Sequence, residues 1–312
     1  MEPVLTRNIG PERCPTNLAA YQANHGYRGL RKALTEMSAD DCQAVVKNSN
    51  LRGRGGAGFP TGMKWSFVPR GDACTPGHKY LVCNADEMEP GTFKDRLLME
   101  CDPHQLIEGM ILAAYTIGAD IAYIFIRGEY LVAIQRLRDA IAECYASGYL
   151  GERILGSDFN LQMHVHPSAG RYICGEETAL INALEGKRAN PRAKPPFPQV
   201  SGLWGRPTIV NNVETLCNIP HIIDRGADWF KTLGVGEDSG TKLFGVSGKV
   251  NNPGCWELPM GHANSRDHRP IRRRHARRIS AKRPSAGRRF NRFLGSRTPR
   301  SGDGLQRDWC GW

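Results

Sequence analysis

Apolar and polar positions along the chain follow a period near 3.6 in some segments and a period of two in others, which predicts alternating helices and strands. The expected helices cover residues 27–35, 39–48 with Ser38 as its cap, 92–100, 103–117, 130–147, 212–224 and 227–233, and one more begins near Gly175. The expected strands cover residues 79–85, 121–127 and 161–166. This alternation predicts an α/β fold with helices on both faces of a sheet.

Some stretches after residue 187 depart from this pattern. Residues 188–207 are rich in proline and predict an ordered loop or a lid, and residues 234–240 look like a linker. Residues 241–260 alternate around the turn at 251–254, as at the start of a β domain. We therefore expect an N-terminal helical segment over 1–50, a main domain over 51–236, the start of an incomplete β domain over 237–261, and a disordered basic tail over 262–312.

Charge changes this picture only in the tail. The formal net charge is +11, but residues 262–312 hold 15 Lys and Arg against 3 Asp, and the rest of the chain holds 27 against 28 acids. The tail lacks the regular charge spacing and interleaved aromatic residues of nucleic-acid-binding arms. It resembles a frame-shifted or aberrant end, so we expect no specific nucleic-acid partner. A non-catalytic protein whose tail binds nucleic acid is the alternative of another class.

The ten cysteines include no pair with the C-x-x-C spacing of a metal or cluster site, and scattered thiols fit a reducing compartment. The N-terminus has no apolar core of the length that a secretory signal needs. The longest apolar run, 106–126, contains Glu108 and Asp120 and a break at 118–120. It predicts a buried helix followed by a strand, so we expect no membrane span.

The run GRGGAGFPTG at 53–62 is the strongest candidate for a ligand loop. Glycines leave consecutive N–H groups unshielded, which suits a phosphate or a nucleotide. A dinucleotide fingerprint follows a strand and opens a helix, whereas the residues before this loop look helical and Pro60 follows, so the ordinary Rossmann motif fits poorly. A Walker A motif also fails, since no Ser or Thr follows Lys64.

Other polar groups stand at the expected ends of strands, where open α/β sheets bind ligands. NADEMEPG at 84–91 holds the carboxylates of Asp86, Glu87 and Glu89, which can accept hydrogen bonds from a ribose or a flavin or bind a divalent metal; a solvated turn is the alternative. YICGEET at 172–178 reads as a strand end passing into a helix start, where two glutamates also suit the helix dipole. Cys174 is expected to be a buried thiol, and His164 and His166 a solvent-facing pair. In TIVNNVET at 208–215, capping explains one of the two asparagines.

Together GRGGAGFPTG, NADEMEPG, YICGEET, AKPPFP and TIVNNVET closely resemble the NADH-binding flavoprotein subunit, known as the F subunit, of bacterial NADH:quinone oxidoreductase, respiratory complex I. The resemblance runs from about residue 1 to Gly261. It implies a modified Rossmann-like domain that binds FMN and NADH and passes a hydride from NADH to FMN for onward electron transfer to quinone. Flavin subunits of NAD-reducing hydrogenases and NAD-linked formate dehydrogenases are similar in the same places and stay as alternatives.

The resemblance also implies two sets of contact residues. The FMN contacts are Gly53, Gly55, Gly56, Lys64, Asn84, Asp86, Glu87, Tyr172, Gly175, Glu176, Asn211, Asn212 and Thr215. The NADH contacts are Phe59, Phe67, Glu89, Glu177, Lys194 and Phe197. Aromatic faces in the second set would stack on adenine.

The chain departs from the family after Gly261. The family continues through a ubiquitin-like β domain and a helical bundle whose cysteines hold a [4Fe–4S] cluster, and those ligands are absent here. We therefore expect a truncated or frame-shifted subunit without a metal site. The resemblance further implies peripheral-arm subunits of complex I as partners, especially the adjacent [2Fe–2S] subunit, and a place on the cytoplasmic face of the inner membrane through the complex.

Overall fold

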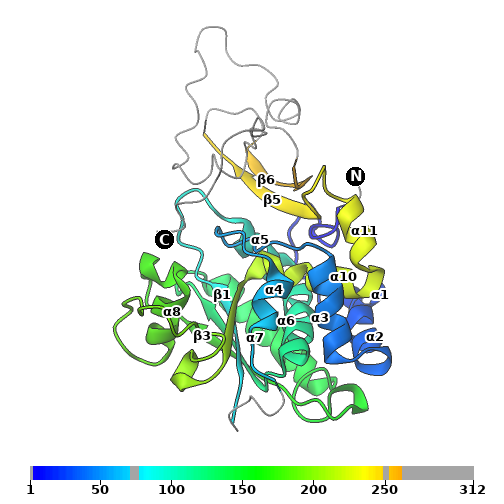
Figure 1. Cartoon of the computed structure of the whole chain (residues 1–312). Helices are drawn as coiled ribbons and strands as arrows, with labels where there is room; N and C mark the ends of the chain where they lie inside the picture. The colour runs from blue at the N-terminus through cyan, green and yellow to red at the C-terminus, as the bar shows by residue number, and fades with distance from the viewer. Residues whose placement is uncertain (1–2, 71–76, 249–252, 262–312) are drawn as a thin grey trace, which may run out of the picture. The chain divides into compact units, whose positions relative to one another are not determined.

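A computed structural model of the chain describes residues 3–70, 77–248 and 253–261. Within these residues, β1 (Tyr80–Ala85), β2 (Ile121–Ile126), β3 (Gln162–Pro167) and β4 (Thr208–Asn212) form a parallel sheet in the order β3-β2-β1-β4 (Figure 1). Each connection between strands is helical, as parallel neighbours require. The expected α/β sheet is confirmed, whereas the expected disorder of the tail lies outside the described residues.

The helices have the following bounds: α1 Leu18–Ala23, α2 Arg28–Glu36, α3 Ala39–Asn48, α4 Thr61–Ser66, α5 Lys94–Cys101, α6 Pro103–Ile117, α7 Leu131–Ala146, α8 Glu177–Leu184, α9 Val213–Cys217, α10 Ile219–Arg225 and α11 Ala227–Thr232. Short 3₁₀ turns cover Ile154–Gly156, Tyr172–Gly175 and Leu203–Gly205. Ser38 caps α3 through a capping box with Asp41, as the sequence predicts.

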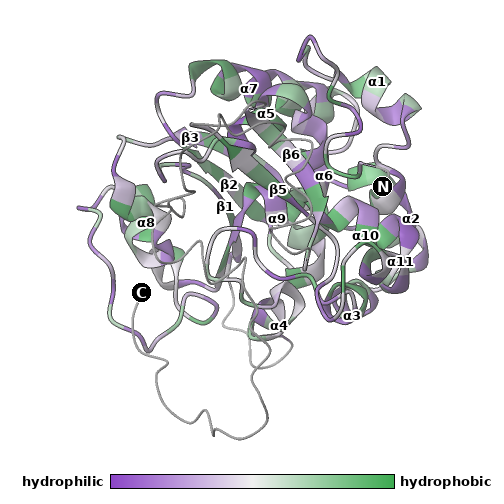
Figure 2. Ribbon diagram, turned by 90° about the horizontal axis from the view of Figure 1, so that it is seen from above, coloured by the Kyte–Doolittle hydropathy of each residue, from purple (hydrophilic) through white to green (hydrophobic). Residues whose placement is uncertain are grey.

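Side chains of the strands alternate between two hydrophobic layers. On β2, Ala122 and Ile124 face the larger core, where α6 and α7 pack, while Phe125 faces a smaller core beneath α8. On β3, Leu161, Met163 and Val165 all join the larger core, so the predicted common face is confirmed. Figure 2 shows α8 across the sheet from α6 and α7. Helices therefore cover both faces.

The hairpin of β5 (Thr241–Val246) and β6 (Gly254–Pro259) is antiparallel and packs on the same unit as the sheet. The carboxylate of Glu257 accepts hydrogen bonds from the backbone N–H groups of Val4, Leu5 and Thr6. The Leu243 N–H donates to Oε1 of Glu214 at 2.7 Å. These contacts attach the hairpin to the N-terminal segment and to α9, while its assignment to a separate β domain stays a prediction.

Several elements differ from the sequence predictions, which include neither α1 nor α4. β4 was not predicted, because residues 188–212 read as a proline-rich loop leading into a helix. The expected helix over 212–224 is divided at Asn218 into α9 and α10, with Pro220 in the first turn of α10. The expected strand end at Tyr172 is a 3₁₀ turn.

Candidate flavin and nucleotide crevice

The order of the strands places the candidate site. From β1 the chain crosses to β2 on one side, and β4 pairs with β1 on the other, so the sheet changes direction between β1 and β4. Ligands of open α/β sheets bind outside the carboxyl ends of the strands at such a point. Asn84 at the end of β1 is the register partner of Asn212 at the end of β4. Two of the predicted contact residues are therefore adjacent. The carboxyl ends of β1 and β4, with residues 53–64 and 172–178 beside them, are called the crevice below.

The glycine loop lies beside this end of β4. A Cβ built on Gly55 would come within 3.1 Å of the Asn212 Cβ, and the Arg54 N–H donates to Oγ1 of Thr215 at 2.8 Å. Gly56 has φ of 127° and open space around a built Cβ, so its backbone can face a ligand without a side chain in the way. The loop follows α3 and precedes α4, which confirms that it does not open a helix after a strand.

Helix α4 connects the glycine loop to the segments 172–178 and 208–215. The Lys64 ammonium lies 2.7 Å from Oε2 of Glu177 and donates to the Val210 carbonyl at 2.9 Å. The indole N–H of Trp65 donates to Oδ1 of Asn211 at 2.9 Å. Lys64 is thus a half-buried cation at the carboxyl ends of the strands, as expected of a group that faces an anionic ligand.

Glu177 is charged in this arrangement. Burial acts to raise the pKa of its carboxyl, but the ammonium of Lys64 and that of Lys194, 2.9 Å from Oε1, outweigh burial and lower it. Lys194 also reaches Oε1 of Glu176 at 3.3 Å. Lys64 and Lys194 therefore form one group of ion pairs with Glu176 and Glu177, which joins predicted contact residues from three separate segments of the sequence.

The three acidic residues that follow β1 each make different contacts. Asp86 is buried, accepts from the Ser168 hydroxyl at 2.7 Å, and has a pKa raised by burial. Glu87 accepts from the N–H groups at the start of α5, and burial, with the nearby Asp95 carboxylate, raises its pKa to about 7. Glu89 is exposed and accepts a hydrogen bond from the Tyr172 hydroxyl. The Glu87 carboxylate thus serves α5, and its contact with a flavin stays a prediction.

The segment 172–178 meets the end of β1. The side-chain amide of Asn84 donates to the Gly175 carbonyl at 3.2 Å. Glu176 caps α8, since its Oε2 accepts from the N–H groups of Thr178 and Ala179 at 2.8 Å. Cys174 is buried and burial raises its pKa to about 11, which agrees with the expected buried, unreactive thiol.

Exposed aromatic side chains lie along the same segments. Phe59 and Phe67 are 43% and 52% exposed, and their ring centroids are 6.4 Å apart. Tyr172 and Phe197 are also more than half exposed. Apolar rings of this size are usually covered in a folded protein, so their exposure favours a planar ligand that stacks on them.

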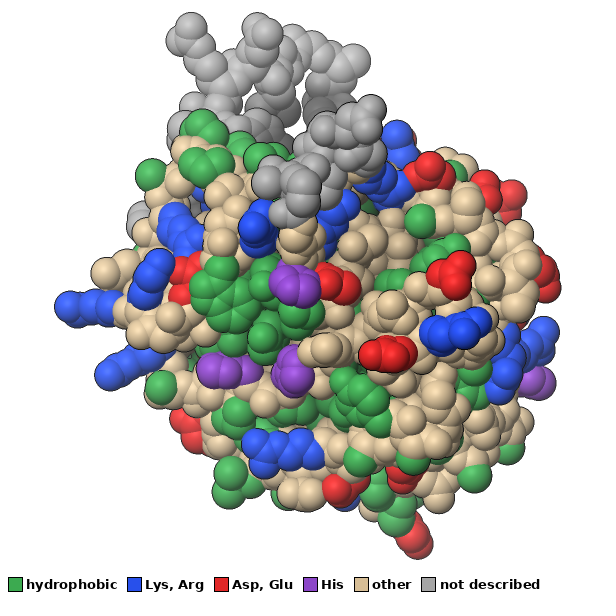
Figure 3. All heavy atoms as spheres, turned by 90° about the horizontal axis from the view of Figure 1, so that it is seen from below, with side chains coloured by type: hydrophobic (Ala, Val, Ile, Leu, Met, Phe, Trp, Pro, Cys, Tyr) green, Lys and Arg blue, Asp and Glu red, His purple; other side chains and the backbone are tan. Residues whose placement is uncertain are grey.

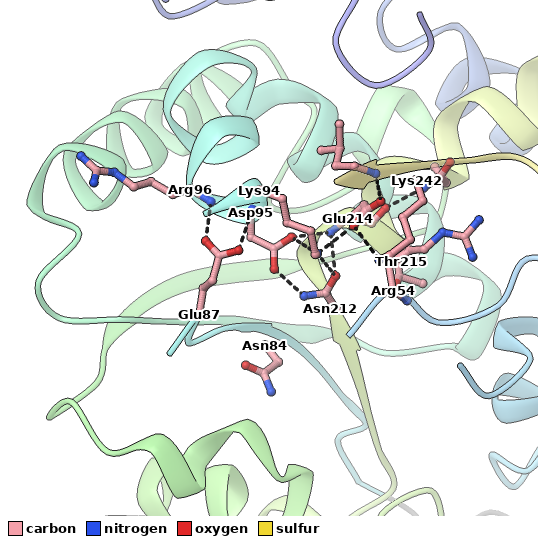
Figure 4. Close-up of polar contacts among 12 residues, drawn as sticks. Arg54, Asn84, Glu87, Lys94, Asp95, Arg96, Asn212, Glu214, Thr215 and Lys242 are labelled. Carbon is pink, nitrogen blue, oxygen red and sulfur yellow. Dashed lines mark hydrogen bonds and ion pairs between the residues drawn. The ribbon is translucent and has the colours of Figure 1, made fainter. Parts of the chain in front are cut away.

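Residues that the sequence reasoning missed form a buried charged cluster, defined here as Arg54, Lys94, Asp95, Glu214 and Lys242 (Figure 4). The Lys94 ammonium lies 2.7 Å from Asp95 Oδ1 and 2.8 Å from Glu214 Oε2. Burial acts to raise the pKa of Glu214, and the cations around it outweigh that effect and lower it. The only sequence feature that pointed to this cluster is the position of Glu214 inside the TIVNNVET segment. Charged residues at the start of a helix are otherwise expected to face solvent.

The two histidines of β3 pack on aromatic rings. His164 lies over Tyr123 with centroids 5.4 Å apart, and His166 stacks on Phe125 at 5.5 Å with an interplanar angle of 15°. Figure 3 shows histidine side chains beside hydrophobic ones on one face of the molecule. Within the described residues, no group of three or more His, Cys, Asp or Glu side chains is placed to hold a metal ion.

The residues at the crevice fit an FMN group. Among the described residues, the buried Oδ2 of Asp86 has no hydrogen-bond partner, so one acceptor at the end of β1 is available to a ligand N–H or hydroxyl. Gly55 and Gly56 of the glycine loop offer N–H groups without side chains in the way, and Lys64 supplies a positive charge. Together these groups match an anionic ligand that also carries donors.

Comparison with known proteins decides the family. Residues 46–221 match the family described as the Nuo51 FMN-binding domain. The chain belongs to this family. The matched range begins within α3 and ends within α10, so it includes the whole crevice.

The relatives extend further than this chain does. The F 2 subunit of NADH-quinone oxidoreductase of Rhizobium meliloti is 60% identical over 83% of this chain and 61% of its own length. The F subunit of NADH-quinone oxidoreductase of Escherichia coli is 56% identical over 82% of this chain and 57% of its own length. A crystal structure of NAD⁺-reducing [NiFe]-hydrogenase in the H₂-reduced state is 40% identical, with a TM-score of 0.69, over 84% of this chain and 42% of that chain. The chain spans about 60% of the length of the curated relatives it matches.

Proposed function

We propose that this member of the Nuo51 FMN-binding domain family is the NADH-oxidising flavoprotein part of an NADH:quinone oxidoreductase of the complex I type. It binds FMN at the carboxyl ends of β1 and β4 and binds NADH beside it. When bound, FMN supplies the acceptor for the hydride of NADH, and the protein supplies binding and orientation.

One observation carries the proposal. Four segments that are far apart in the sequence meet at one edge of the sheet, through the close approach of Gly55 to Asn212, the bond from Asn84 to the Gly175 carbonyl, and the pair of Lys64 with Glu177. These are four of the five segments that carry the family resemblance. If these segments were only surface turns, their contacts with one another at this edge of the sheet would have no explanation.

The residues divide between the two ligands as follows. On the FMN side, Gly55 and Gly56 present backbone N–H groups, Lys64 balances negative charge, and Asp86 offers its unpartnered oxygen. The Gly53 N–H donates to the Phe59 carbonyl at 2.9 Å, so Gly53 contacts FMN through its bare Cα rather than through its N–H. The remaining FMN contacts are Asn84, Glu87, Tyr172, Gly175, Glu176, Asn211, Asn212 and Thr215. On the NADH side, the exposed rings of Phe59, Phe67 and Phe197 stack on the adenine. The side chains of Glu89, Glu177 and Lys194 bind polar groups of NADH.

The relatives' names support a proposal about partners and location. Relatives that are F subunits imply assembly with peripheral-arm subunits of complex I, and we infer that the adjacent [2Fe–2S] subunit is one of them, on the cytoplasmic face of the inner membrane. In the described part of the chain, no helix is both long and apolar enough to cross a bilayer. The cysteines of this chain do not fit a [4Fe–4S] site, since no two of them are separated by two residues, and no step is assigned to such a cluster.

The proposal is tested by titrating the purified full chain with FMN and following the quenching of flavin fluorescence. NADH is then added without oxygen, and the loss of visible flavin absorbance is recorded. We expect saturable FMN binding and bleaching by NADH. Free FMN fluorescence at every protein concentration, or a bound flavin that NADH never bleaches, would refute the proposal.

A matched pair of variants separates the two ligands. Glu177→Gln should weaken NADH binding, because Lys64 and Lys194 lose their shared carboxylate, and should leave FMN bound. Glu143→Gln also removes a carboxylate that contacts a basic side chain, Nε2 of His104 at 3.1 Å, but away from the crevice, and should change neither affinity. Equal effects of the two substitutions on NADH binding would contradict the assignment of the NADH side.

A flavin subunit of a NAD-reducing hydrogenase is the second candidate, favoured by the likeness to the hydrogenase structure. Its identity of 40% is below the 60% and 56% of the relatives from NADH-quinone oxidoreductase, which favours complex I. Both candidates predict the same flavin chemistry, so partners must separate them. Co-expression with the [2Fe–2S] subunit of either complex, followed by co-purification, identifies the cognate assembly.

A further inference from the structure

We propose that Lys94 is a positioning residue of the FMN crevice, which acts through the Asn212 side chain on the backbone of the glycine loop. This inference rests on the proposed function, because it assigns a role in FMN binding to a residue outside the predicted contacts. Three features of the molecule support it: the burial of Lys94, the hold on Asn212, and the contact of Asn212 with Gly55.

The first feature is the position of Lys94 in the buried charged cluster. Lys94 is 8% exposed and stands at the first position of α5, while Asp95 is 3% exposed and Glu214 is fully buried. Burial acts to lower the pKa of Lys94, and the carboxylates of Asp95 and Glu214 outweigh burial and raise it. The ammonium is therefore charged and held in place by two acids from different elements, α5 and α9.

The second feature is the set of hydrogen bonds from this cluster to the Asn212 side chain, which Figure 4 shows beside Lys94 and Asp95. Oδ1 of Asn212 accepts from the Lys94 ammonium at 3.3 Å and from the Glu214 N–H at 3.0 Å. Its amide group donates to Asp95 Oδ2 at 2.6 Å. Both ends of the carboxamide are thus used within the protein, which fixes its orientation and the position of its Cγ.

The third feature is the contact of Asn212 with the glycine loop. The Asn212 Cβ lies 3.1 Å and its Cγ 3.7 Å from a Cβ built on Gly55, so the loop and the Asn212 side chain lie in close contact. A shift of Asn212 must therefore move Gly55 or open a gap beside it. Since the loop N–H groups are proposed to bind FMN, the orientation of Asn212 controls how well these groups are placed.

Removing the Lys94 charge should weaken FMN binding without removing an FMN contact. In Lys94→Met, the carboxylates of Asp95 and Glu214 lose their shared cation and repel each other, and Asn212 loses one of its donors. We expect the dissociation constant for FMN to rise at least tenfold. Lys32→Met is the control for loss of a lysine, because the partly buried Lys32 ammonium donates to the backbone carbonyls of Ile223 and Asp224, away from the crevice.

A double-mutant cycle tests the route through Asn212. The FMN dissociation constant is measured for wild type, Lys94→Met, Asn212→Ala and the double variant of the full chain, with urea unfolding in the absence of FMN to compare their stability. If Lys94 acts through Asn212, the double variant binds FMN no more weakly than Asn212→Ala alone. If Lys94 has only a structural role, Lys94→Met lowers the free energy of unfolding. Its effect on the FMN dissociation constant then multiplies that of Asn212→Ala in the double variant.

The outcomes separate this inference from the proposed function. Wild type that does not bind FMN refutes the proposed function and the inference with it. Wild type that binds FMN, with multiplicative effects in the double variant or with Lys94→Met at wild-type affinity, overturns the inference alone. If Lys94→Met does not fold, Asn212→Ala decides, because wild-type FMN affinity in that variant also overturns the inference.

Discussion

Glu108 should make the stability of the fold depend on pH. Its carboxylate, on α6 and 1% exposed, accepts hydrogen bonds from the Tyr21 hydroxyl at 2.6 Å and from the N–H groups of Tyr27 and Leu30 at 2.8 and 3.1 Å. Tyr27 caps α2 with φ of 59°, so this carboxylate supports a strained helix start. Burial raises the pKa of Glu108 to about 7, although the hydrogen bonds act to lower it.

The sign of the effect follows from the direction of the shift. The folded protein holds the Glu108 proton more tightly than the unfolded chain, whose carboxyl has its usual pKa of 4.5. The resulting stabilisation is complete below pH 4.5 and is lost as the pH rises through 7. A difference of this size corresponds to about 3 kcal/mol in total, of which about 2.5 kcal/mol is lost between roughly pH 5 and pH 8.

Urea unfolding of wild type and Glu108→Gln at these two pH values measures the contribution. Glutamine has no proton to lose, so the stability of wild type relative to the variant should fall by about 2.5 kcal/mol from the acidic to the alkaline condition. Glu152→Gln, at an exposed position, is the control and should follow the wild-type profile. Parallel pH profiles of wild type and Glu108→Gln would refute the reasoning.

Three further substitutions test the crevice and the helix caps. Gly55→Ala places a Cβ 3.1 Å from that of Asn212 and should raise the FMN dissociation constant about tenfold, measured by flavin fluorescence, while Gly10→Ala, with open space around it, should not. Arg54→Met leaves buried carbonyls of the loop and hairpin without their donor and should cost about 3 kcal/mol in urea unfolding, and a loss below about 1 kcal/mol would contradict it. Ser38→Ala removes the capping box of α3 and should cost about 1 kcal/mol in the same assay; an unchanged midpoint would count against this role.

The sequence predicted elements whose signals are local. The predicted helix over 103–117 has the same bounds as α6, because a long apolar pattern starts at a proline and ends before Gly118, which has φ of 71°. The start of α3 was predicted from Ser38 for the same kind of reason. At the crevice, the glycine loop and the acidic segment were singled out because glycine runs and grouped carboxylates are visible without tertiary structure.

Elements that depend on distant partners were missed. β4 has five residues, two of them asparagines that favour turns, and it becomes a strand by pairing with β1. α4 has six residues and begins just after Pro60, and its position depends on the buried Trp65 and its bond to Asn211. The charged cluster was invisible for a similar reason, since a lysine and an aspartate at a helix start read as solvent-facing until the packing of α9 against α5 buries them.

The glycine-rich run shows why a motif and a site do not coincide residue by residue. Gly55 and Gly56 lie in the loop at the end of β4, where small size and open space favour a ligand. Gly62 belongs to α4, and a Cβ there would meet the Lys47 backbone of α3 at 2.4 Å, so this glycine permits two helices to pack. The glycines of one run therefore have two different roles: those in its first half leave room for a ligand, and Gly62 at its end lets α4 pack against α3. Because α4 packs there, Lys64, two residues after Gly62, lies at the crevice.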